Sequence, residues 1–341
     1  MPEIGLLKPQ QNPSWDDFVA NHPAGTVFHL SAWAGVMQNA FGHKTHYIVA
    51  TGGGAITGVL PLVELKSRLF GHALISTAFC VGGGPLARDD ESRRALLKEA
   101  ERLARELNVG YVELRDTGPA EGWTARDDLY AGFEREMAPD EAQNLLQIPR
   151  KQRAVVRKAI EGDFRVTTDK DLDTFYALFS RTVRDHGTPV FSKKFFREIL
   201  AAFPNDADIL TVWQNETPLS SVLSYYFRDR VYPYYTGSNP EARVAGTNDL
   251  MYWKLMRHAV ARGCKIFDFG RSKVGTGPYA FKKNWGFEPR PIAHQYLLLK
   301  RDTLPNVNPT NPRYAKLIEI WRRLPIPVAN FVSQFISRNL G

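Results

Sequence analysis

Cysteine is scarce in this chain, with two cysteines among 341 residues. Cys80 and Cys264 are far apart, form no C-x-x-C motif and have no histidine cluster at zinc-site spacing. The eight histidines are scattered, and although His43 and His46 are three residues apart, no third ligand lies nearby. These absences argue against a disulfide framework and against a metal, and they indicate a reducing compartment.

Long apolar runs are also absent. No window approaches the roughly 18 uninterrupted apolar residues that a membrane-spanning helix needs. The first residues, MPEIGLLKPQQNPSW, lack the basic segment and apolar core of a secretory signal peptide. We therefore expect a soluble, cytoplasmic protein.

Acidic residues are too few to balance the basic ones. The chain has 44 Lys and Arg against 36 Asp and Glu, which gives a net charge of +8. Such an excess favours a polyanionic partner, for example RNA, a nucleotide diphosphate group or an anionic membrane face, but does not choose among them. Many basic proteins have no such partner. The length is sufficient for two domains.

The order of predicted helices and strands occurs twice along the chain. In the first half we expect helices at 15–21, 31–41 and 91–107, and strands at 47–51, 56–65, 72–79, 110–114, 133–137 and 145–148. In the second half we expect helices at 170–185, 192–203 and 249–262, and strands at 164–167, 209–213, 219–227, 231–236, 265–269 and 292–299. The similarity of VGYVELRD to CKIFDFGRS supports duplication.

This order of elements is similar to that of the GNAT acyltransferase fold. The predicted fold class is α+β, with two tandem GNAT-like (acyl-CoA N-acyltransferase) domains whose mixed central sheets are flanked by helices. We expect the first domain at 1–148 and the second at 163–304, joined by a basic junction helix at 149–162. A helical C-terminal tail is expected at 305–341.

Residues 264–287, CKIFDFGRSKVGTGPYAFKKNWGF, carry the strongest local signal. An apolar strand contains one acid, Asp268, and leads through a glycine break to Arg271 and then to Lys282 and Lys283. Enzymes with α/β folds present polar groups to an anionic substrate in this way. The alternative is a strand, a turn and an ordinary solvated helix.

A second candidate is the loop expected before the long helix of the second half. GNAT domains carry R-x-x-G-x-G/A there, and backbone N–H groups hold the pyrophosphate of an acyl-CoA. This chain matches with Arg243 and Gly246, continues with Thr247, and departs from the pattern at Asn248. The alternative is a helix cap, in which Thr247, Asn248 or Asp249 satisfies helix amides.

A third candidate is the basic segment PRKQRAVVRK at the junction between the halves. Arg150, Arg153 and Arg157 lie at i, i+3 and i+7, on one helical face. Like charges at this spacing repel, so that an anion bound to Arg153 and Arg157 would relieve the repulsion. Clefts between domains are common substrate sites. The alternative is a solvated linker helix.

Two single residues and the tail remain open. His186 lies at the start of a loop. It acts as a general base or only ends the preceding helix. Tyr235 belongs to a row of strand tyrosines that pack in a core or orient a substrate through a hydroxyl. The tail carries an amphipathic stripe that includes Phe331 and Phe335, and it lies on the inner face of a membrane or packs onto the body.

The chain resembles the FemAB/FemX family of peptidoglycan-bridge aminoacyltransferases, which are tandem GNAT-like proteins. The segments that carry the resemblance are LLQIPRKQRAVVRKAIEGDFRV, NDLMYWKLMRHAVARGCKIFDFGRS and GPYAFKKNWGFEP. With HGTPVFSKKFF added, the chain is most similar to the FemAB-related branch associated with exosortase/PEP-CTERM systems. The long coiled-coil arm with which some members grip tRNA is missing.

The resemblance implies attack of an amine on an activated carbonyl to give an amide. Aminoacyl-tRNA or acyl-CoA would be the donor substrate, no cofactor would be tightly bound, and an amine-bearing envelope precursor or small molecule would be the acceptor. The family pattern F-K-x-x-F/W assigns Lys282 to the developing oxyanion, while Asp268 and Arg271 would position substrate. Three hypotheses compete: transfer from aminoacyl-tRNA, transfer from acyl-CoA, and a non-catalytic component at a membrane surface.

Overall fold

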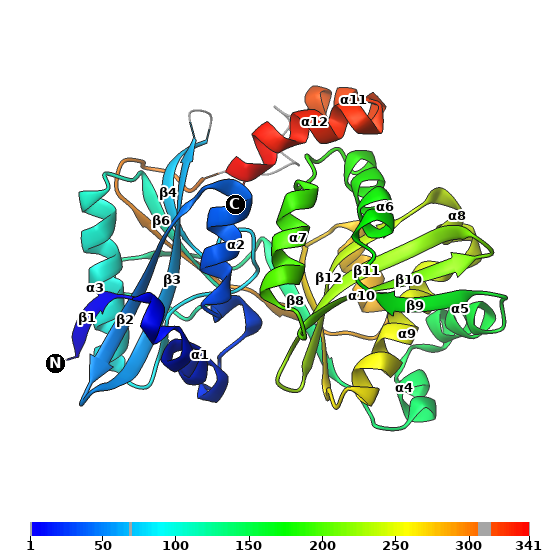
Figure 1. The fold of residues 1–341 in the computed structure, drawn as a ribbon, viewed down its shortest axis with the longest axis horizontal. Coiled ribbons are helices and arrows are strands. Elements are labelled where there is room, and N and C mark those ends of the chain that lie inside the picture. Colours follow the sequence, from blue (N-terminus) through cyan, green and yellow to red (C-terminus); the bar gives the residue numbers. More distant parts are fainter. Residues whose placement is uncertain (1, 68–69, 306–314, 341) are drawn as a thin grey trace. The chain divides into compact units, whose positions relative to one another are not determined.

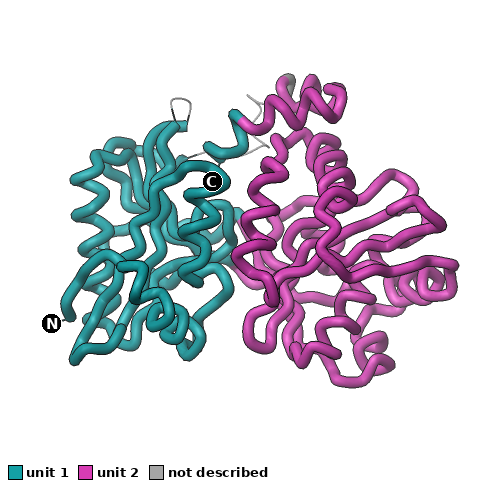
Figure 2. The backbone as a smooth tube through the Cα atoms, viewed as in Figure 1, with its two compact units in different colours: residues 1–129, 292–308, 335–341 teal, residues 130–291, 309–334 magenta. Residues whose placement is uncertain are grey.

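A computed structural model describes residues 2–67, 70–305 and 315–340. The chain forms two compact units, each with its own sheet and helices (Figure 2). Unit 1 contains residues 1–129, 292–308 and 335–341, and unit 2 contains residues 130–291 and 309–334. Each unit is described by itself below.

Unit 1 has an eight-stranded sheet in the order β1-β2-β3-β4-β6-β15-β7, with β5 paired to β3. Helix α3 covers one face of this sheet, and α1 and α2 cover the other (Figure 1). The strands are β1 (Glu3–Leu6), β2 (Lys44–Gly52), β3 (Ala55–Ser67), β4 (Gly71–Ser76), β5 (Leu86–Ala87), β6 (Tyr111–Arg115), β7 (Thr124–Arg126) and β15 (His294–Leu298). The helices are α1 (Asn12–Asn21), α2 (Ala32–Phe41) and α3 (Asp90–Glu106).

Helix α3 illustrates how local sequence fixes an element. Its N-cap is Asp89, whose carboxylate accepts a hydrogen bond from the Ser92 amide. Leu96, Leu103 and Ala104 recur at helical spacing and are buried against the sheet. The helix expected at 91–107 is therefore confirmed to within one residue at each end.

Unit 2 has a seven-stranded sheet in the order β14-β8-β13-β12-β11-β10-β9. Helices α6 and α7 lie on one face, and α9, with α5 packed beside it, lies on the other. The strands are β8 (Tyr130–Glu136), β9 (Arg165–Asp169), β10 (Ala207–Gln214), β11 (Thr217–Phe227), β12 (Arg230–Ser238), β13 (Ile266–Lys273) and β14 (Pro289–Pro291). The helices are α4 (Glu141–Gln147), α5 (Arg150–Ile160), α6 (Leu172–Asp185), α7 (Lys193–Ala202), α8 (Pro240–Ala245), α9 (Thr247–Ala261), α10 (Gly277–Asn284), α11 (Ala315–Arg323) and α12 (Ile326–Ile336). The last two residues of α12 belong to unit 1.

The two sheets have the same topology, as expected for a duplicated fold. Read from one edge, β1-β2-β3-β4-β6-β15-β7 corresponds to β9-β10-β11-β12-β13-β8-β14. Each sheet has one parallel pair, β4 with β6 and β12 with β13, at the same place in the order. The prediction of tandem GNAT-like domains with mixed sheets is thus supported by topology alone.

The last strand of each repeat belongs to the other repeat's sheet. Strand β8 follows β7 in the chain but pairs with β13 and β14 in unit 2. Strand β15 follows β14 but pairs with β6 and β7 in unit 1. The units therefore divide between Leu129 and Tyr130, whereas the sequence placed residues 130–148 in the first domain.

The face of the unit 2 sheet under α6 and α7 is filled with aromatic rings. Tyr235 is 7% exposed, and its ring lies 5.0 Å from that of Phe196 and 5.7 Å from that of Phe179. Helix α6 approaches β12 so closely that a Cβ at Gly237 would clash with the backbone at Phe179. Aromatic packing and one glycine therefore set the distance between helix and sheet.

Two segments of unit 2 fold differently from the sequence-based prediction. Residues 145–148, expected as a strand, lie at the end of α4 and just beyond it. Residues 240–245, expected within a loop, form helix α8, whose N-cap Asn239 accepts a hydrogen bond from the Ala242 amide. Asp140 caps α4 in the same manner, and both caps favour helix over the extended chain.

Candidate functional site

The parallel strands β12 and β13 separate soon after they meet. They pair at Arg230 with Ile266 and at Val231 with Phe267. Strand β12 nevertheless continues to Ser238, and β13 continues beyond Phe267 as well. Beyond Val231, one edge of β12 therefore presents backbone groups that β13 does not pair with.

A β-bulge lies in β13 where the strands separate. Between the paired positions Asp268–Glu134 and Arg271–Gly132, β13 has two residues and β8 has one. Gly270, one of the two, has φ +65°, which glycine adopts without steric cost. The bulge breaks the alternation of carbonyl directions along β13.

Lys282, from α10, binds the carbonyl groups of this bulge. Its Nζ donates to the carbonyl oxygens of Phe269 at 2.6 Å, Gly270 at 3.2 Å and Arg271 at 3.0 Å. The side chain is 9% exposed, and burial lowers its pKa to about 7. Because an ammonium group has three N–H donors, these bonds use its full capacity.

Asp268 fixes the same bulge from its own strand. Its Oδ1 accepts a hydrogen bond from the Gly270 amide at 2.8 Å. Burial, with a smaller contribution from nearby Glu134, raises the pKa of this carboxyl to about 6, against the lowering effects of the Gly270 amide and of Arg230 and Lys282. The carboxyl thus titrates close to neutral pH. Its second oxygen, Oδ2, does not take part in the hydrogen bond with the Gly270 amide.

Arg271 and Lys283 lie near this centre and rest on aromatic rings. The Arg271 guanidinium lies 4.4 Å from the ring centroid of Tyr130, and the Lys283 ammonium lies 5.9 Å from that of Tyr279. Lys283 is exposed, and Arg271 is half-buried. Within the described ranges neither cation pairs with an acidic side chain, so both are available to an anion.

A buried carboxylate ties the helix of Lys282 to the basic helix α5. Oδ1 of Asp249, on α9, accepts from the Trp285 indole at 2.8 Å and from the Gln152 amide at 2.6 Å. Trp285 directly follows α10, and Gln152 lies on α5. Burial raises the pKa of Asp249 despite both bonds.

Helix α5 presents a basic face to solvent. A hollow of about 460 Å³ along it is lined by Arg150, Arg153, Ala154, Arg157, Lys158 and Glu161. Val156 and Ala159, on the other side of the helix, are buried in the core. Among the described residues none of the four lining cations has an acidic partner. The structure thus brings Arg153 and Arg157 to one face, as the sequence predicted.

The segment Arg243–Asn248 forms a helix-glycine-helix corner rather than an open loop. Gly246 has φ +72° and ends α8, and Thr247 begins α9 fully buried, with its hydroxyl bonded to Ala242 O. No side chain caps α9, in contrast to the predicted cap. A Cβ at Gly246 would lie 3.5 Å from that of Ala159, so this corner packs on α5, and Arg243 is exposed.

Two other predicted residues lie away from Lys282. Tyr235 belongs to the aromatic core under α6 and α7. His186 is the C-cap of α6, and the Gly187 that follows it packs tightly against Ile318 of α11. Core packing accounts for the position of Tyr235, and helix termination accounts for that of His186.

The equivalent strand end in unit 1 is closed. Strands β4 and β6 pair at three positions, and the Arg115 amide then donates to Ser76 Oγ at 2.9 Å. The Arg115 side chain, 4% exposed, donates to Glu113 at 2.8 Å and to the carbonyl of Cys80 at 2.9 Å. A buried ion pair thus occupies the place where unit 2 has its separated strands.

The residues that surround Asp268 from other strands were not predicted from the sequence. Glu134, on β8, pairs with Arg230, on β12, at 2.7 Å. Tyr130, whose ring contacts the Arg271 guanidinium, also comes from β8. No local signal links these residues to β13, because β8 precedes it by more than 100 residues and was expected in the other domain.

The described ranges contain neither a candidate metal site nor a candidate membrane-spanning helix. No group of three or more His, Cys, Asp or Glu side chains in residues 2–67, 70–305 and 315–340 is arranged to hold a metal ion. In the same ranges, no helix combines the length and the apolar character that crossing a bilayer requires.

Comparison with protein families gives a match within unit 2. Residues 142–283 match the acetyltransferase (GNAT) domain family, which supports the predicted acyltransferase. A search of curated protein sequences gives no match.

Solved structures share the fold over nearly the whole chain. The crystal structure of FemX is 18% identical, with a TM-score of 0.70, and the match covers 93% of this chain and 100% of FemX. The tandem GNAT protein from the clavulanic acid biosynthesis pathway is 14% identical, with a TM-score of 0.55, over 87% and 98% of the two chains. L-PGS from Bacillus licheniformis is 13% identical, with a TM-score of 0.56, over 93% and 97%. The tandem GNAT fold is confirmed, whereas the exosortase-associated branch stays a prediction.

Proposed function

We propose that unit 2 transfers an acyl or aminoacyl group from an activated donor to an amine and forms an amide. The observation that carries this proposal is the early separation of β12 and β13, with Lys282 and Asp268 at the bulge. A donor with an amide-containing or extended chain can pair with the open edge of β12 as an added strand does. The closed strand end of unit 1 supports a single site, in unit 2.

The chemistry needs few protein groups. The amine nitrogen bonds to the donor carbonyl carbon, the carbon–oxygen bond of an ester or carbon–sulfur bond of a thioester breaks, and the amine loses a proton. Asp268, with a pKa of about 6, accepts that proton on the oxygen that Gly270 does not use and passes it to the departing oxygen or sulfur, which leaves as an alcohol or a thiol. The Lys282 ammonium, whose donors are taken by three carbonyls, holds the bulge in place and adds positive charge near the developing oxyanion.

The donor we propose is aminoacyl-tRNA. The four unpaired cations of α5 and the unpaired Arg271 suit a donor with several phosphates. The corner at Arg243–Asn248 offers less to the pyrophosphate of an acyl-CoA than an open loop does, because Thr247 is buried. Acyl-CoA is the second candidate, favoured by the match of residues 142–283 to an acetyltransferase domain. The proposed acceptor, an amine of an envelope or exopolysaccharide precursor, rests on the FemAB/FemX resemblance.

Labelled donors test this proposal directly. Purified protein is incubated with aminoacyl-tRNA or acyl-CoA that carries a radioactive acyl group, with and without a panel of amines. We expect label to enter an amide product from one donor class, and Asp268→Asn and Lys282→Met to lower the rate at least tenfold. Lys265→Met, which removes an exposed lysine of the same unit, serves as the control. Failure of the wild-type protein to transfer from either donor would favour a non-catalytic role.

A further inference from the structure

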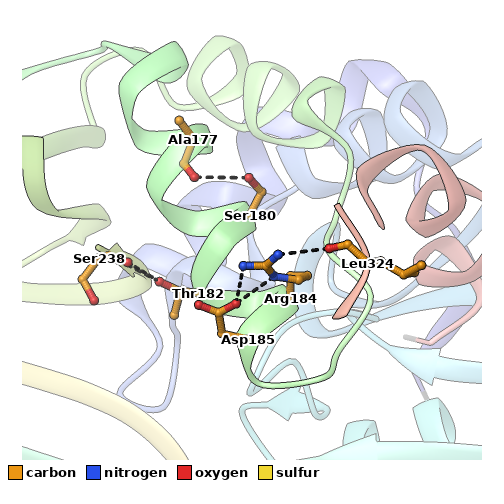
Figure 3. Close-up of polar contacts among 7 residues, drawn as sticks. All are labelled: Ala177, Ser180, Thr182, Arg184, Asp185, Ser238 and Leu324. Atoms are coloured by element: carbon orange, nitrogen blue, oxygen red, sulfur yellow. Dashed lines mark hydrogen bonds and ion pairs between the residues drawn. The ribbon is translucent and has the colours of Figure 1, made fainter. Parts of the chain in front are cut away.

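The end of strand β12 is hydrogen-bonded to a side chain of helix α6. The Thr182 hydroxyl accepts a hydrogen bond from the Ser238 amide at 2.8 Å and donates one to the Ser238 carbonyl oxygen at 3.0 Å. Figure 3 shows Thr182 against the backbone of Ser238, the last residue of the strand. One hydroxyl thus satisfies both backbone groups of Ser238, because it can donate and accept at once.

The backbone groups of Ser238 point to the open edge of β12. The next residue, Asn239, donates its amide to the carbonyl of Leu219, on the side of β11, at 2.9 Å. Since the backbone groups of successive strand residues point to opposite sides, those of Ser238 point to the edge that β13 leaves. Those of Thr236, two residues earlier, point to the same edge. Thr182 therefore closes the last position of this edge, and Thr236 is the next position inward.

Close packing of α6 on β12 brings Thr182 to this place. A Cβ at Gly237 would clash with the backbone of Phe179, and Thr182 follows Phe179 by three residues, on the same face of α6. Figure 3 also shows Arg184, whose guanidinium donates to the carbonyl of Leu324 at 3.0 Å. Both contacts fix the end of α6, so the Thr182 hydroxyl is held against β12.

The chain that carries the acyl group distinguishes the two candidate donors. The reacting carbonyl belongs at the bulge of β13, where the open edge begins, because Asp268 and Lys282 are there. In an acyl-CoA the acyl group is attached to pantetheine, an extended chain whose two amide groups can pair along a strand edge. In an aminoacyl-tRNA an ester joins the acyl group directly to a ribose. A closed position at the end of β12 therefore hinders the first donor more than the second.

We propose that Thr182 determines donor specificity by ending the open edge of β12 at Thr236. To pair at Ser238, a pantetheine chain would have to break both hydrogen bonds of Thr182. An aminoacyl ester does not need this position, so the hydroxyl discriminates against acyl-CoA. The identity of the donors rests on the proposed function, whereas the closure of the edge rests on the geometry of unit 2.

Ligand binding by the full chain tests this role without turnover. Acetyl-CoA, pantetheine and adenosine 3′,5′-bisphosphate, a nucleotide without the pantetheine chain, are titrated into the protein in a calorimeter. We expect Thr182→Ala, which opens the edge, to bind acetyl-CoA and pantetheine at least about tenfold more tightly than the wild type, and the bisphosphate equally. Thr182→Ser keeps the hydroxyl and should bind all three as the wild type does.

The matched control removes a hydroxyl from the same helix. Ser180 is buried, and its hydroxyl donates to the carbonyl of Ala177 at 3.3 Å, within α6, as Figure 3 shows. Ser180→Ala should therefore leave all three affinities unchanged. Three results would overturn the proposal: wild-type affinity for acetyl-CoA in Thr182→Ala, an equal gain in Ser180→Ala, or a gain that extends to the bisphosphate.

Hydrogen exchange in the wild-type protein gives a second test, which does not depend on the folding of any variant. The Ser238 amide should exchange slowly, and acetyl-CoA should leave its rate unchanged, because Thr182 already accepts from it. Exchange at the rate of an unbonded amide, or slower exchange on addition of acetyl-CoA, would contradict the closure of the edge. If neither donor supports transfer, the proposed function fails, while the binding and exchange results still decide the role of Thr182.

Discussion

At the scale of single residues, the hydrogen bonds of Lys282 limit how its ammonium group can act on a substrate. The sequence predicts a lysine that contacts the developing oxyanion. The structure places its Nζ within 3.2 Å of three carbonyl oxygens of β13. We infer that the ammonium acts chiefly by holding the bulge, because a group with all its donors in use offers none to substrate.

This role predicts opposite effects of pH on activity and on stability. Burial lowers the pKa of Lys282 to about 7, so the ammonium that holds the bulge is lost as pH rises through 7. We expect the transfer rate to fall about tenfold per pH unit above that value. The free energy of unfolding should instead rise from about pH 7 to the ordinary lysine pKa, because the unfolded chain then binds the extra proton.

Rate profiles and denaturant titrations between pH 6 and 10 check both trends, since about 10.4 is the ordinary value for lysine. In Lys282→Met both pH dependences should disappear, and in Lys265→Met both should remain. If Lys282→Met kept the fall in transfer rate above pH 7, that fall would be due to the titration of another group.

Gly237 is a second residue with a sharp consequence. Because a Cβ would clash with the backbone of α6 at Phe179, we expect Gly237→Ala to lower the free energy of unfolding by about 2 kcal/mol or more. Gly277→Ala, at a position with no neighbour within 4 Å, should change it by less than about 0.5 kcal/mol. Urea titration measures both, and equal values would contradict the close packing of α6 on β12.

At the scale of elements, helix α5 combines a buried apolar face with an unpaired basic one. Arg153→Glu with Arg157→Glu should weaken donor binding at least about tenfold and lower the log–log salt slope by about two, because two phosphate contacts are lost. Filter binding of tRNA over a range of salt measures the slope.

The matched control for α5 lies on α3. Arg102→Glu with Arg105→Glu makes the same change in net charge at residues exposed by 60% and 63%. These arginines pair with acidic neighbours and line no basic hollow, so their reversal should leave the slope unchanged. Equal losses of donor binding in both double variants would show that binding depends only on the overall charge of the protein.

The order of elements was predictable from the sequence because its signals are local. The apolar period of α3 and the strand patterns of β3 and β11 each lie within a short window. Helix α8 was missed because its six residues are too few to show a period. The basic face of α5 could be predicted from the spacing of its arginines. The bulge at Gly270 could not, because it is defined by the pairing of β13 with β8.

At the scale of the whole molecule, the exchange of β8 and β15 could not be predicted from the sequence. A strand pattern shows that a segment is extended, but not which sheet it joins. Both strands lie at the ends of their repeats, where the simplest assumption keeps each with its own half. The predicted boundary near residue 148 followed from that assumption.

The exchange predicts which fragment of the chain folds. Residues 130–291 contain every strand of the unit 2 sheet, whereas residues 163–304, the predicted second domain, lack β8 and carry β15 without its partners. We expect the first fragment to unfold cooperatively in urea and the second to aggregate or to lack a transition. Circular dichroism and size-exclusion chromatography measure this, and cooperative unfolding of 163–304 alone would contradict it.

The exchanged strands also set an order of events during synthesis on the ribosome. The second sheet is complete as soon as Pro291 has emerged, because β8 has been synthesised before it. The first sheet, although made earlier, keeps the edge of β6 open until His294–Leu298 arrive. The sheet of the N-terminal half is therefore the last to be completed, and until then the edge of β6 can pair with another chain.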